Sequence, residues 1–205
     1  MQQARARDRR ARILDAALRV FSRRGYHGAS VDEIADESGT SKGGLYFHFP
    51  GKQALFLALL DWAAGELRRR VEAAMALHQD PVARADAALL AVMRSFAAHR
   101  DLARLFMVEA LGAGREFHER LLAINDEFTG IIQGLLDEAV AAGVIEPVDT
   151  RIAARAWFGA VNAVVTDWIL SERPGPLEAA YEDLRPLLAR SVGASYTLGQ
   201  EAASG

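Results

Sequence analysis

Four consecutive ring side chains follow two glycines in the segment GTSKGGLYFHF, residues 39–49. Ser41 and Lys42 precede the glycines, and hydroxyl, ammonium and free backbone N–H groups are donors that bind phosphate. Tyr46 carries a hydroxyl that can also reach a phosphate, whereas the apolar ring of Phe47 suits contact with the methyl group of a thymine. These residue types at this spacing predict contact with a nucleic acid.

The residues around this segment predict two short helices joined by a tight turn. Ser30 followed by Glu33 is typical of a capping box, in which each side chain bonds the backbone N–H group of the other residue. Gly39 is expected to end this helix, and Ser41 to begin the next one as its N-cap. Together with the longer amphipathic helix before them, these elements predict a helix-turn-helix unit.

The second short helix is expected to lie in the major groove of DNA, with its N-terminal residues toward the bases. Leu45 and Phe49 are four residues apart, so they share one face, which packs inward against Ile34 and Phe21. The glycines at 43–44 let the backbone approach DNA closely. The opposite face of the helix is therefore the one that meets DNA.

The N-terminal end of the chain is basic. Residues 1–52 hold ten Lys and Arg and six Asp and Glu, a net charge of +4, so the rest of the chain carries −7 because the total is −3. A basic end on an acidic body indicates that one end meets a polyanion, although a solvated helix face explains the charge equally well. The arginines before Ile13 are expected to form a flexible arm that adds affinity for any DNA sequence, and Gly25 is expected to end the first helix.

The segment RARILDAALRVFSRRGYHGASVDEIADESGTSKGGLYFHFPGKQAL resembles the DNA-binding domain of TetR-family transcriptional regulators. The shared motifs include ILDAA at residues 13–17, the glycine turn at 39–43 and LYFHF at 45–49. The sequence departs from the family at Thr40, where an apolar residue is usual, and at Gly44, where a larger residue often contacts a base. The resemblance implies an all-helical homodimer, usually a repressor that a small ligand releases from DNA.

Motif and resemblance together predict which residues contact DNA. Tyr46 and Lys52 are expected on phosphates, so alanine at either position should weaken binding to every sequence. The alternatives are a packed or solvated ring for His48 and a solvated helix start for Lys52. The expected DNA-binding residues are Ser30, Thr40, Ser41, Lys42, Gly43, Tyr46, Phe47, His48 and Lys52.

Helical periodicity continues along the rest of the chain, and neither a strand nor a repeat is predicted. We predict an all-α protein of about nine helices. The later helices are expected at 52–77, 81–99, 101–111, 115–142, 150–171 and 177–191, with N-caps at Asp80, Asp101 and either Asp149 or Thr150. The expected domains are a helix-turn-helix domain over 1–51, a ligand-binding and dimerisation bundle over 52–195 and a flexible tail over 196–205.

Composition and motifs disfavour several other function classes. The chain has no cysteine, which excludes disulfides and thiolate metal sites, and the uncharged stretch 156–166 is too short to span a bilayer. No Glu-x-x-His pair for a di-iron site and no nucleotide-binding glycine motif occurs, so an enzyme is not expected. We predict a cytoplasmic protein without metal, cofactor or membrane contact. A helical interaction scaffold would explain the bundle but not the glycine turn.

The last two long helices carry apolar stripes, and in the family that the chain resembles the corresponding helices of two subunits form a four-helix bundle. Small residues such as Ala153 and Gly159 would permit close approach of helices. Burial of both stripes within one chain is the alternative. The candidate dimer contacts are Ala156, Ala160, Val164, Trp168, Leu184 and Leu188.

The middle of the chain is rich in Met and aromatic residues at helical spacing, which suit either an ordinary core or an apolar cavity. Few polar side chains accompany them, which favours an elongated lipophilic effector over a sugar. The segments 153–170 and 176–188 also resemble the C-terminal part of fatty-acid-responsive members of the family, so we predict a long-chain acyl-CoA or fatty acid. The pocket candidates are Trp62, Met93, Phe96, Phe106, Phe128, Asn125, Trp157 and Asn162.

The charged end of the effector distinguishes two hypotheses. An acyl-CoA or fatty acid has an anionic head, which is expected near arginines; the candidates are Arg68, Arg69, Arg104 and Arg115. The alternative effector is an aromatic cation, which would require Glu109, Asp126 or Asp167 inside the protein. Either effector is expected to lower DNA affinity by favouring a wider spacing of the two DNA-reading heads.

Overall fold

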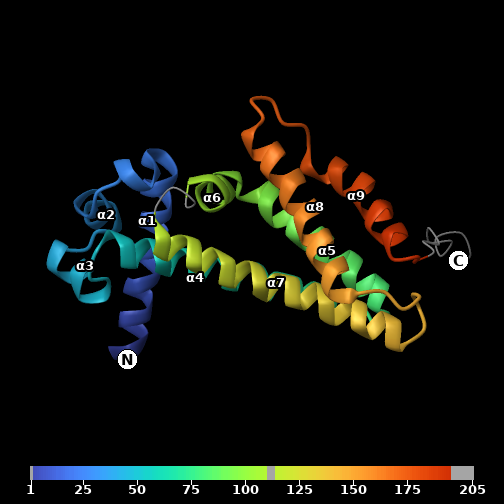
Figure 1. Ribbon diagram of the computed structural model, residues 1–205. Helices are drawn as coiled ribbons and strands as arrows, with labels where there is room; N and C mark the ends of the chain where they lie inside the picture. Colours follow the sequence, from blue (N-terminus) through green and yellow to red (C-terminus); the bar gives the residue numbers. More distant parts are fainter. Residues whose placement is uncertain (1, 110–113, 195–205) are drawn as a thin grey trace, which may run out of the picture. The chain divides into compact units, whose positions relative to one another are not determined.

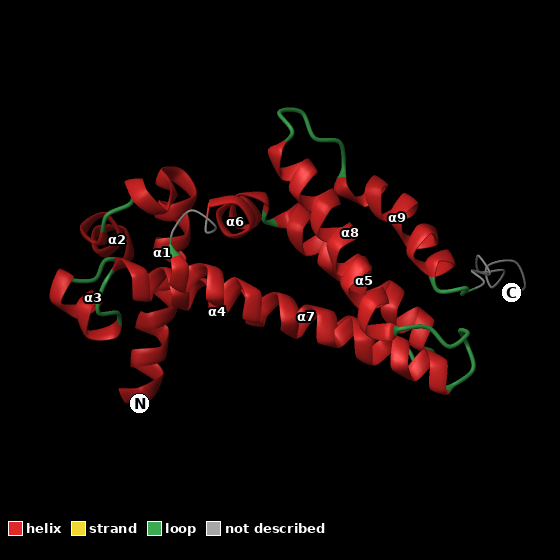
Figure 2. Cartoon of the chain, viewed as in Figure 1, coloured by secondary structure: helices red, strands yellow, loops and turns green. Residues whose placement is uncertain are grey.

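The computed structural model describes residues 2–109 and 114–194, with side chains described for 8–108 and 114–194. Within these ranges the chain consists of helices and short loops (Figure 2). In chain order they are α1 Gln2–Gly28, α2 Val31–Ser38, α3 Lys42–His48, α4 Lys52–Met75, α5 Pro81–Ala98, α6 Arg100–Arg104, the π-helix η1 Leu105–Glu109, α7 Arg115–Ala141, α8 Thr150–Leu170 and α9 Leu177–Ser191 (Figure 1). The predicted all-α class and the expected number of helices are confirmed for this part of the chain.

Four helices, α2, α3, α5 and α8, begin at side-chain caps that the sequence predicts. In each case a side-chain oxygen accepts a hydrogen bond from the backbone N–H group three residues later, which satisfies one of the free donors of the first turn. The N–H to oxygen distances are 3.1 Å at Ser30, 3.2 Å at Ser41, 2.7 Å at Asp80 and 3.0 Å at Asp149.

Two glycines adopt positive φ angles where the helices of the N-terminal end must break. Gly25 has φ 67° and interrupts α1, after which one further turn continues to Gly28. Gly39 has φ 62° and ends α2 in the left-handed conformation. A side chain at either position would clash with its own backbone, so the sequence correctly marks both breaks.

The structure corrects three local expectations. The arginine-rich arm is not irregular, because α1 is helical from Gln2 onward. The helix expected from Asp101 to Leu111 begins at Arg100, after His99, and passes into the π-helix η1 at Leu105. Glu33 does not complete the capping box, because its carboxylate turns toward arginines of α1, 3.8 Å from Arg23 and 3.5 Å from Arg24. The expected helix end at Leu111 and the tail at 196–205 lie outside the described residues.

By its internal contacts the chain divides into two compact units. The first comprises residues 1–67 and 99–124, and the second comprises 68–98 and 125–205. Residues 52–67 of α4 and 115–124 of α7 therefore belong to the same unit as α1, α2 and α3. The domain boundary expected at residue 51 separates the segment predicted to bind DNA from the predicted ligand-binding and dimerisation bundle. This boundary stays a prediction.

An aromatic cluster forms the core of the first unit. The ring of Phe56 in α4 lies 5.0 Å from Phe21 in α1 and 5.1 Å from Phe117 in α7, both edge to face. Tyr26 lies 5.0 Å from both Phe56 and Phe117, and Phe106 of η1 lies 5.8 Å from Phe56. Edge-to-face ring pairs contribute about 0.5–1.5 kcal/mol each beyond the burial of their area. This cluster joins α1 to α4, α7 and η1.

An ion-pair clamp holds α1 against α2. Glu37 of α2 accepts a hydrogen bond from Arg19 Nε at 2.7 Å and is also bonded by Arg23. The hydrogen bonds from Arg23 and then Arg19 lower the pKa of Glu37 from its ordinary 4.5 to about 2. Glu37 therefore stays ionised in the folded protein well below the pH at which it takes up a proton in the unfolded chain.

The second unit is built from α5, α8, α9 and the remainders of α4 and α7. Asp86 of α5 accepts hydrogen bonds from Tyr181 Oη and Arg185 Nε of α9, each at 2.9 Å. Near the end of α7, a cluster of small and aliphatic residues is buried against the end of α9: Leu136, Ala139, Ile145, Ala154, Ala189, Val192 and Ala194. A polar contact and an apolar cluster thus fix α9 on its own protomer.

The Glu37 clamp generates a prediction about pH. Because the folded-state pKa of Glu37 is depressed, its contribution to stability is present above pH 4.5 and is lost as pH falls from 4.5 toward 2. We expect Glu37→Gln to lower the melting temperature by a few degrees at pH 7. The difference from the wild type should shrink as the pH is lowered through this window, as measured by circular dichroism melts between pH 7 and pH 3.

The neighbouring Asp36 offers a matched control. It is an exposed carboxylate of the same helix, so Asp36→Asn should change the melting temperature little at any pH. A difference between Glu37→Gln and the wild type that is the same at pH 7 and pH 3 would contradict the clamp.

Candidate DNA interface and effector-binding residues

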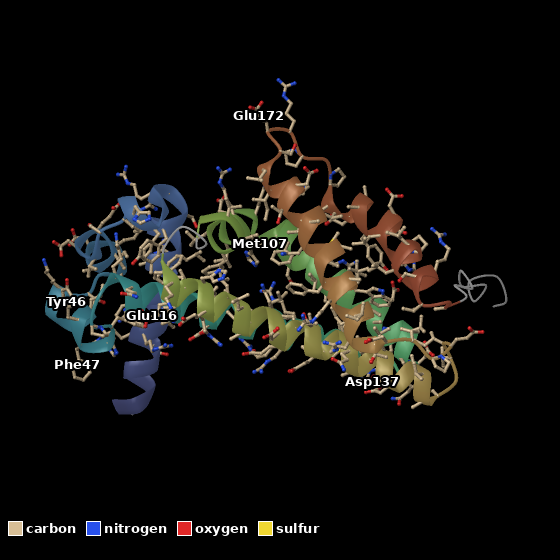
Figure 3. The ribbon with its side chains drawn as sticks, in the orientation of Figure 1. Tyr46, Phe47, Met107, Glu116, Asp137 and Glu172 are labelled. Carbon is tan, nitrogen blue, oxygen red and sulfur yellow. The ribbon has the colours of Figure 1, made fainter. Side chains whose placement is uncertain are left out.

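The third helix presents one face to solvent and the other to the core. Leu45 and Phe49 are buried, as expected, whereas Tyr46 is 43% exposed and Phe47 is 85% exposed. Figure 3 shows Tyr46 and Phe47 at the outer side of α3. The helix is anchored by its inner residues, so the outward side chains are held on a fixed surface. This geometry suits a helix that enters a groove.

The N-terminal end of α3 brings the two departures from the family pattern into contact. A Cβ atom at Gly44 would lie 3.0 Å from Cγ2 of Thr40 and 3.1 Å from the capping Oγ of Ser41. At Gly43 a Cβ atom would meet nothing within 4 Å. The side chains of the turn therefore fill the space above Gly44, while Gly43 leaves room for an approaching molecule.

Lys42 has a partner within the protein. Its Nζ lies 2.8 Å from Asp32 of α2, and both side chains are exposed. The hydrogen bond to Asp32 raises the pKa of Lys42, with Coulombic attraction adding to it. An exposed pair of this kind is weak, because water and salt screen it, so a phosphate can compete for the ammonium group.

Lys52 lies differently from expectation. Its Nζ donates to the backbone carbonyl groups of His27 at 3.2 Å and Ala29 at 3.0 Å, and it lies 4.8 Å from the ring centroid of Tyr26. The ammonium group thus satisfies carbonyls at the end of α1 and holds the start of α4 against it. A phosphate contact by Lys52 stays a prediction, and the structure gives this residue an architectural role.

The other predicted DNA contacts have mixed positions. His48 is half-buried, with its ring 5.4 Å from that of Phe47 and 6.4 Å from that of Phe49, so packing explains it as well as DNA contact does. Ser30 is exposed, but its hydroxyl already caps α2. The outward surface of α3 is therefore centred on Lys42, Gly43, Tyr46 and Phe47.

The predicted effector-pocket residues do not gather in one place. Trp62 is 38% exposed on α4, and Phe106 belongs to the aromatic cluster of the first unit. Trp157 packs on the core cluster of the second unit and donates its indole N–H to Ser191 at 3.0 Å. Asn162 is exposed on a shallow groove of α8. Each of these four side chains is either at the surface or already used in packing, which gives their assignment to a pocket less support, and it stays a prediction.

The remaining pocket candidates lie in the second unit. Met93 of α5 is fully buried, while Phe96, Asn125 and Phe128 are half-buried. Half-buried aromatic side chains are positions that a bound apolar molecule would cover further.

The charged candidates are at the surface where the structure describes them. Arg68 lies 3.7 Å from Glu72 and Arg115 lies 2.7 Å from Glu119, each within its own helix. Asp126 and Asp167 are exposed, so neither provides the buried anion that a cationic effector would need. Arg104 is exposed as well, and the side chain of Glu109 lies outside the described residues.

The predicted dimer contacts on α9 are buried within the single chain, and their role in a dimer stays a prediction. Leu184 is 6% exposed and Leu188 is 7% exposed within the single chain, because α9 packs on α5 and α8. On α8, Trp168 is half-buried and donates to the carbonyl of Gly175 at 2.8 Å. Ala160 and Val164 are also half-buried, whereas Ala156 is exposed. The exposed stripe of α8 is therefore rotated from the predicted one.

Several functional side chains have no signal in the sequence. Asp32 pairs with Lys42 although ten residues separate them, and helical periodicity relates only residues of one helix. Phe56 and Phe117 look like ordinary core residues until the fold brings them together with Tyr26. Within the described residues, no helix is long and apolar enough to cross a membrane, and no cluster of His, Asp or Glu suits a metal ion.

Two family models match the chain. Residues 13–59 match the bacterial regulatory proteins of the tetR family, and residues 78–169 match the tetracyclin repressor-like C-terminal domain. The fatty acid metabolism regulator protein of Bacillus subtilis is 26% identical over 184 residues, which span 88% of this chain and 93% of that protein. The transcriptional activator FasR of Mycolicibacterium smegmatis is 55% identical over 53 residues, 26% of this chain and 24% of that protein.

The fold is also similar to a solved structure. The transcriptional regulator FadR from Bacillus subtilis, in complex with stearoyl-CoA, superposes with a TM-score of 0.81 at 24% identity, covering 91% of this chain and 99% of that one. At this identity the likeness concerns the fold.

The contacts of Lys52 generate a prediction about stability. Lys52→Met keeps the length of the side chain and removes the two hydrogen bonds to carbonyl groups. We expect the free energy of unfolding, measured by urea titration, to fall by about 1–2 kcal/mol. Lys42→Met is the matched control and should leave it nearly unchanged, because its ion pair is exposed and screened by water and salt. Unchanged stability in Lys52→Met, with a salt dependence of DNA binding reduced by about one unit, would instead support the phosphate contact.

Proposed function

Because the chain belongs to the TetR family of bacterial regulatory proteins, it is a DNA-binding transcriptional regulator, and we propose that it is a repressor that a long-chain acyl-CoA or fatty acid releases from DNA. The exposed face of α3, fixed by the burial of Leu45 and Phe49, is the observation that carries the DNA-binding part. The effector part rests on the apolar character of the second unit and on the relatives that it resembles.

On DNA, α3 is proposed to lie in the major groove. Tyr46 donates its hydroxyl to a phosphate and sets the position of the helix, and Phe47 contacts the methyl group of a thymine. Gly43 allows the backbone of the first turn to approach the groove. Lys42 exchanges its contact with Asp32 for a phosphate, which leaves the Asp32 carboxylate unpaired near DNA.

In the second unit, several bulky apolar side chains are incompletely covered. Every residue of α5 from 81 to 92 is half-buried, as are Phe96 of α5 and Phe128, Ile131 and Ile132 of α7. Covering such side chains with an alkyl chain stabilises the complex by about 0.8 kcal/mol for each buried methylene group. This distribution supports a ligand with a long apolar part.

Two hydroxyl groups near these residues form hydrogen bonds within their own helices. Ser95 donates its hydroxyl to the carbonyl of Ala91 at 2.7 Å, and Thr129 donates to that of Asn125 at 2.7 Å. Hydroxyl groups engaged in this way offer little to a sugar or an amino acid. The exposed positions of Asp126 and Asp167 also give less support to the alternative of an aromatic cation.

The protein is proposed to bind DNA as a homodimer through the exposed stripe of α8. This stripe contains Ile152, Ala156, Gly159, Ala163 and Leu170. Its small central residues permit a second helix to approach closely, and the larger aliphatic residues at the two ends gain most from burial. A dimer would place two α3 helices on one DNA duplex. The effector lowers DNA affinity only if it binds the released state more tightly than the bound state.

Two substitutions on the α3 surface should change DNA affinity in opposite directions. Asp32→Asn removes an anion beside Lys42, so we expect binding about 5-fold tighter on every sequence, with a steeper salt dependence. Tyr46→Phe removes a hydroxyl that positions the helix, so we expect binding about 5-fold weaker on every sequence. The measurement is fluorescence anisotropy with a duplex from the region upstream of the protein's own gene.

Opposite signs separate this interpretation from a general loss of folding, which would weaken binding in both variants. If the wild type binds this duplex no better than a scrambled duplex, and no site emerges from random-sequence selection, the DNA-binding assignment fails. If both variants bind as the wild type does, α3 is not the reading helix.

The effector proposal is tested by DNA release with acyl-CoAs of increasing length. At about 0.8 kcal/mol per buried methylene, the half-releasing concentration should fall by up to about 4-fold for each methylene added, until the pocket is filled. Phe128→Ala should weaken release by long chains without changing DNA affinity, and Trp62→Ala, at the surface of α4, should leave release unchanged. Release that does not depend on chain length, or that occurs only with cationic dyes, would rule out the lipid effector.

A further inference from the structure

The arginines of α1 fall into two groups with different surroundings. Those toward the C-terminal end are paired with the two glutamates of α2, since Arg19, Arg23 and Arg24 all form ion pairs with Glu33 or Glu37. Arg9 and Arg12, toward the N-terminal end, are exposed and form no ion pair with any side chain that the structure describes. The uncompensated positive charge of α1 is thus concentrated in its first turns.

A specific contact places these first turns next to α3. The guanidinium group of Arg10 lies 5.3 Å from the centroid of the Phe49 ring, a distance typical of cation–π contacts. Phe49 is buried and directly follows α3, the helix that carries Tyr46 and Phe47. Figure 1 shows the first turns of α1 and α3 on the same side of the first unit. The contact between Arg10 and Phe49 therefore holds the first turns of α1 beside α3, the DNA-reading helix.

The spacing of the free arginines suits a pair of neighbouring anions. Arg9 and Arg12 are three residues apart in a continuous helix, so their Cβ atoms lie about 5–6 Å from each other on one face. Each guanidinium group can donate two parallel hydrogen bonds to one phosphate. Asp8 is also exposed in this turn and offsets one of the charges. Because the helix fixes the backbone of both arginines, only side-chain freedom is lost when they bind.

We propose that the first turns of α1, through Arg9 and Arg12, bind DNA phosphates that flank the base pairs contacted by α3. This inference rests on the proposed function, because it requires α3 to lie in the major groove. It replaces the expected flexible arm with a rigid extension of the reading surface. The extension adds affinity and lengthens the contacted site without reading additional bases.

The test compares the wild type with the double substitution Arg9→Ala/Arg12→Ala on a duplex chosen by random-sequence selection. In a dimer, four phosphate contacts would be lost, so the slope of log affinity against log salt should become shallower by about 3–4 units. Hydroxyl-radical footprinting should show loss of protection on the outer flanks of the site, while protection at its centre is retained. The ratio of specific to nonspecific affinity should change little.

Three controls keep the outcomes separate. Arg9→Lys/Arg12→Lys should retain most of the salt dependence and the flanking protection, because a phosphate contact needs the charge. Arg94→Ala/Arg173→Ala removes one exposed arginine from α5 and one from the loop after α8, and it should change neither. Melting curves and helix content should be the same for all variants, since Arg9 and Arg12 make no described contact that folding needs.

Each failure has its own signature. If the wild type shows no preferred DNA sequence, the proposed function is wrong. If the wild type binds its selected site but the alanine double variant keeps the same salt slope and the same footprint, the inference about α1 is overturned and the proposed function stands. The inference is also overturned if the lysine and alanine variants lose flanking protection equally, because charge is then not the cause.

Discussion

The ring of Phe56 lies between Phe21 and Phe117 and brings three helices to one point. Its contacts at 5.0 and 5.1 Å join α4 to α1 and α7, and Phe106 attaches the π-helix η1 to the same ring. Since α1 forms the frame on which α2 and α3 pack, the position of the DNA-reading helix depends on this cluster. Packed rings have few alternative arrangements, so a displacement of α4 or η1 must be passed to α1 or must break the cluster.

The same unit contains a segment with a nonstandard helical hydrogen-bond pattern. The π-helix η1 follows α6 directly and contributes Phe106 to the cluster. Helices of this type are rare and occur often at functional sites. Through Phe106 this segment is packed into the core of the same compact unit as α3.

Electrostatic pairing decides which cations of the N-terminal end are available to DNA. The sequence has ten basic residues in this region, yet Arg19, Arg23 and Arg24 are paired with acids, and Lys52 is bound to carbonyl groups. Pairing inside the unit stabilises the helix-turn-helix and reduces the repulsion among its cations. As a result, fewer cations are available to bind phosphates than the count of basic residues indicates. Net charge alone is therefore a poor guide to the DNA-binding surface.

The sequence by itself determines the local elements of this protein. Caps at Ser30, Ser41 and Asp149, and breaks at Gly25 and Gly39, follow from interactions within a few residues, and the helix-turn-helix motif is read from the same signals. Helical periodicity also shows that Leu45 and Phe49 are internal and that Tyr46 and Phe47 are external. These features are predictable because each depends on backbone geometry that neighbouring residues control.

Only the tertiary structure decides which partner each side chain takes. Leu184 and Leu188 form an apolar stripe that suits either a dimer interface or the core of one protomer. In the structure α9 packs on α5, and both leucines are buried within the protomer. The sequence around Lys52 predicts a phosphate contact. In the structure its ammonium group instead donates hydrogen bonds to the carbonyl groups of His27 and Ala29. Trp157 and Phe106 are apolar enough for a pocket, yet each fills a core. Contacts between residues distant in sequence depend on how whole helices pack, and one chain's periodicity does not specify that packing.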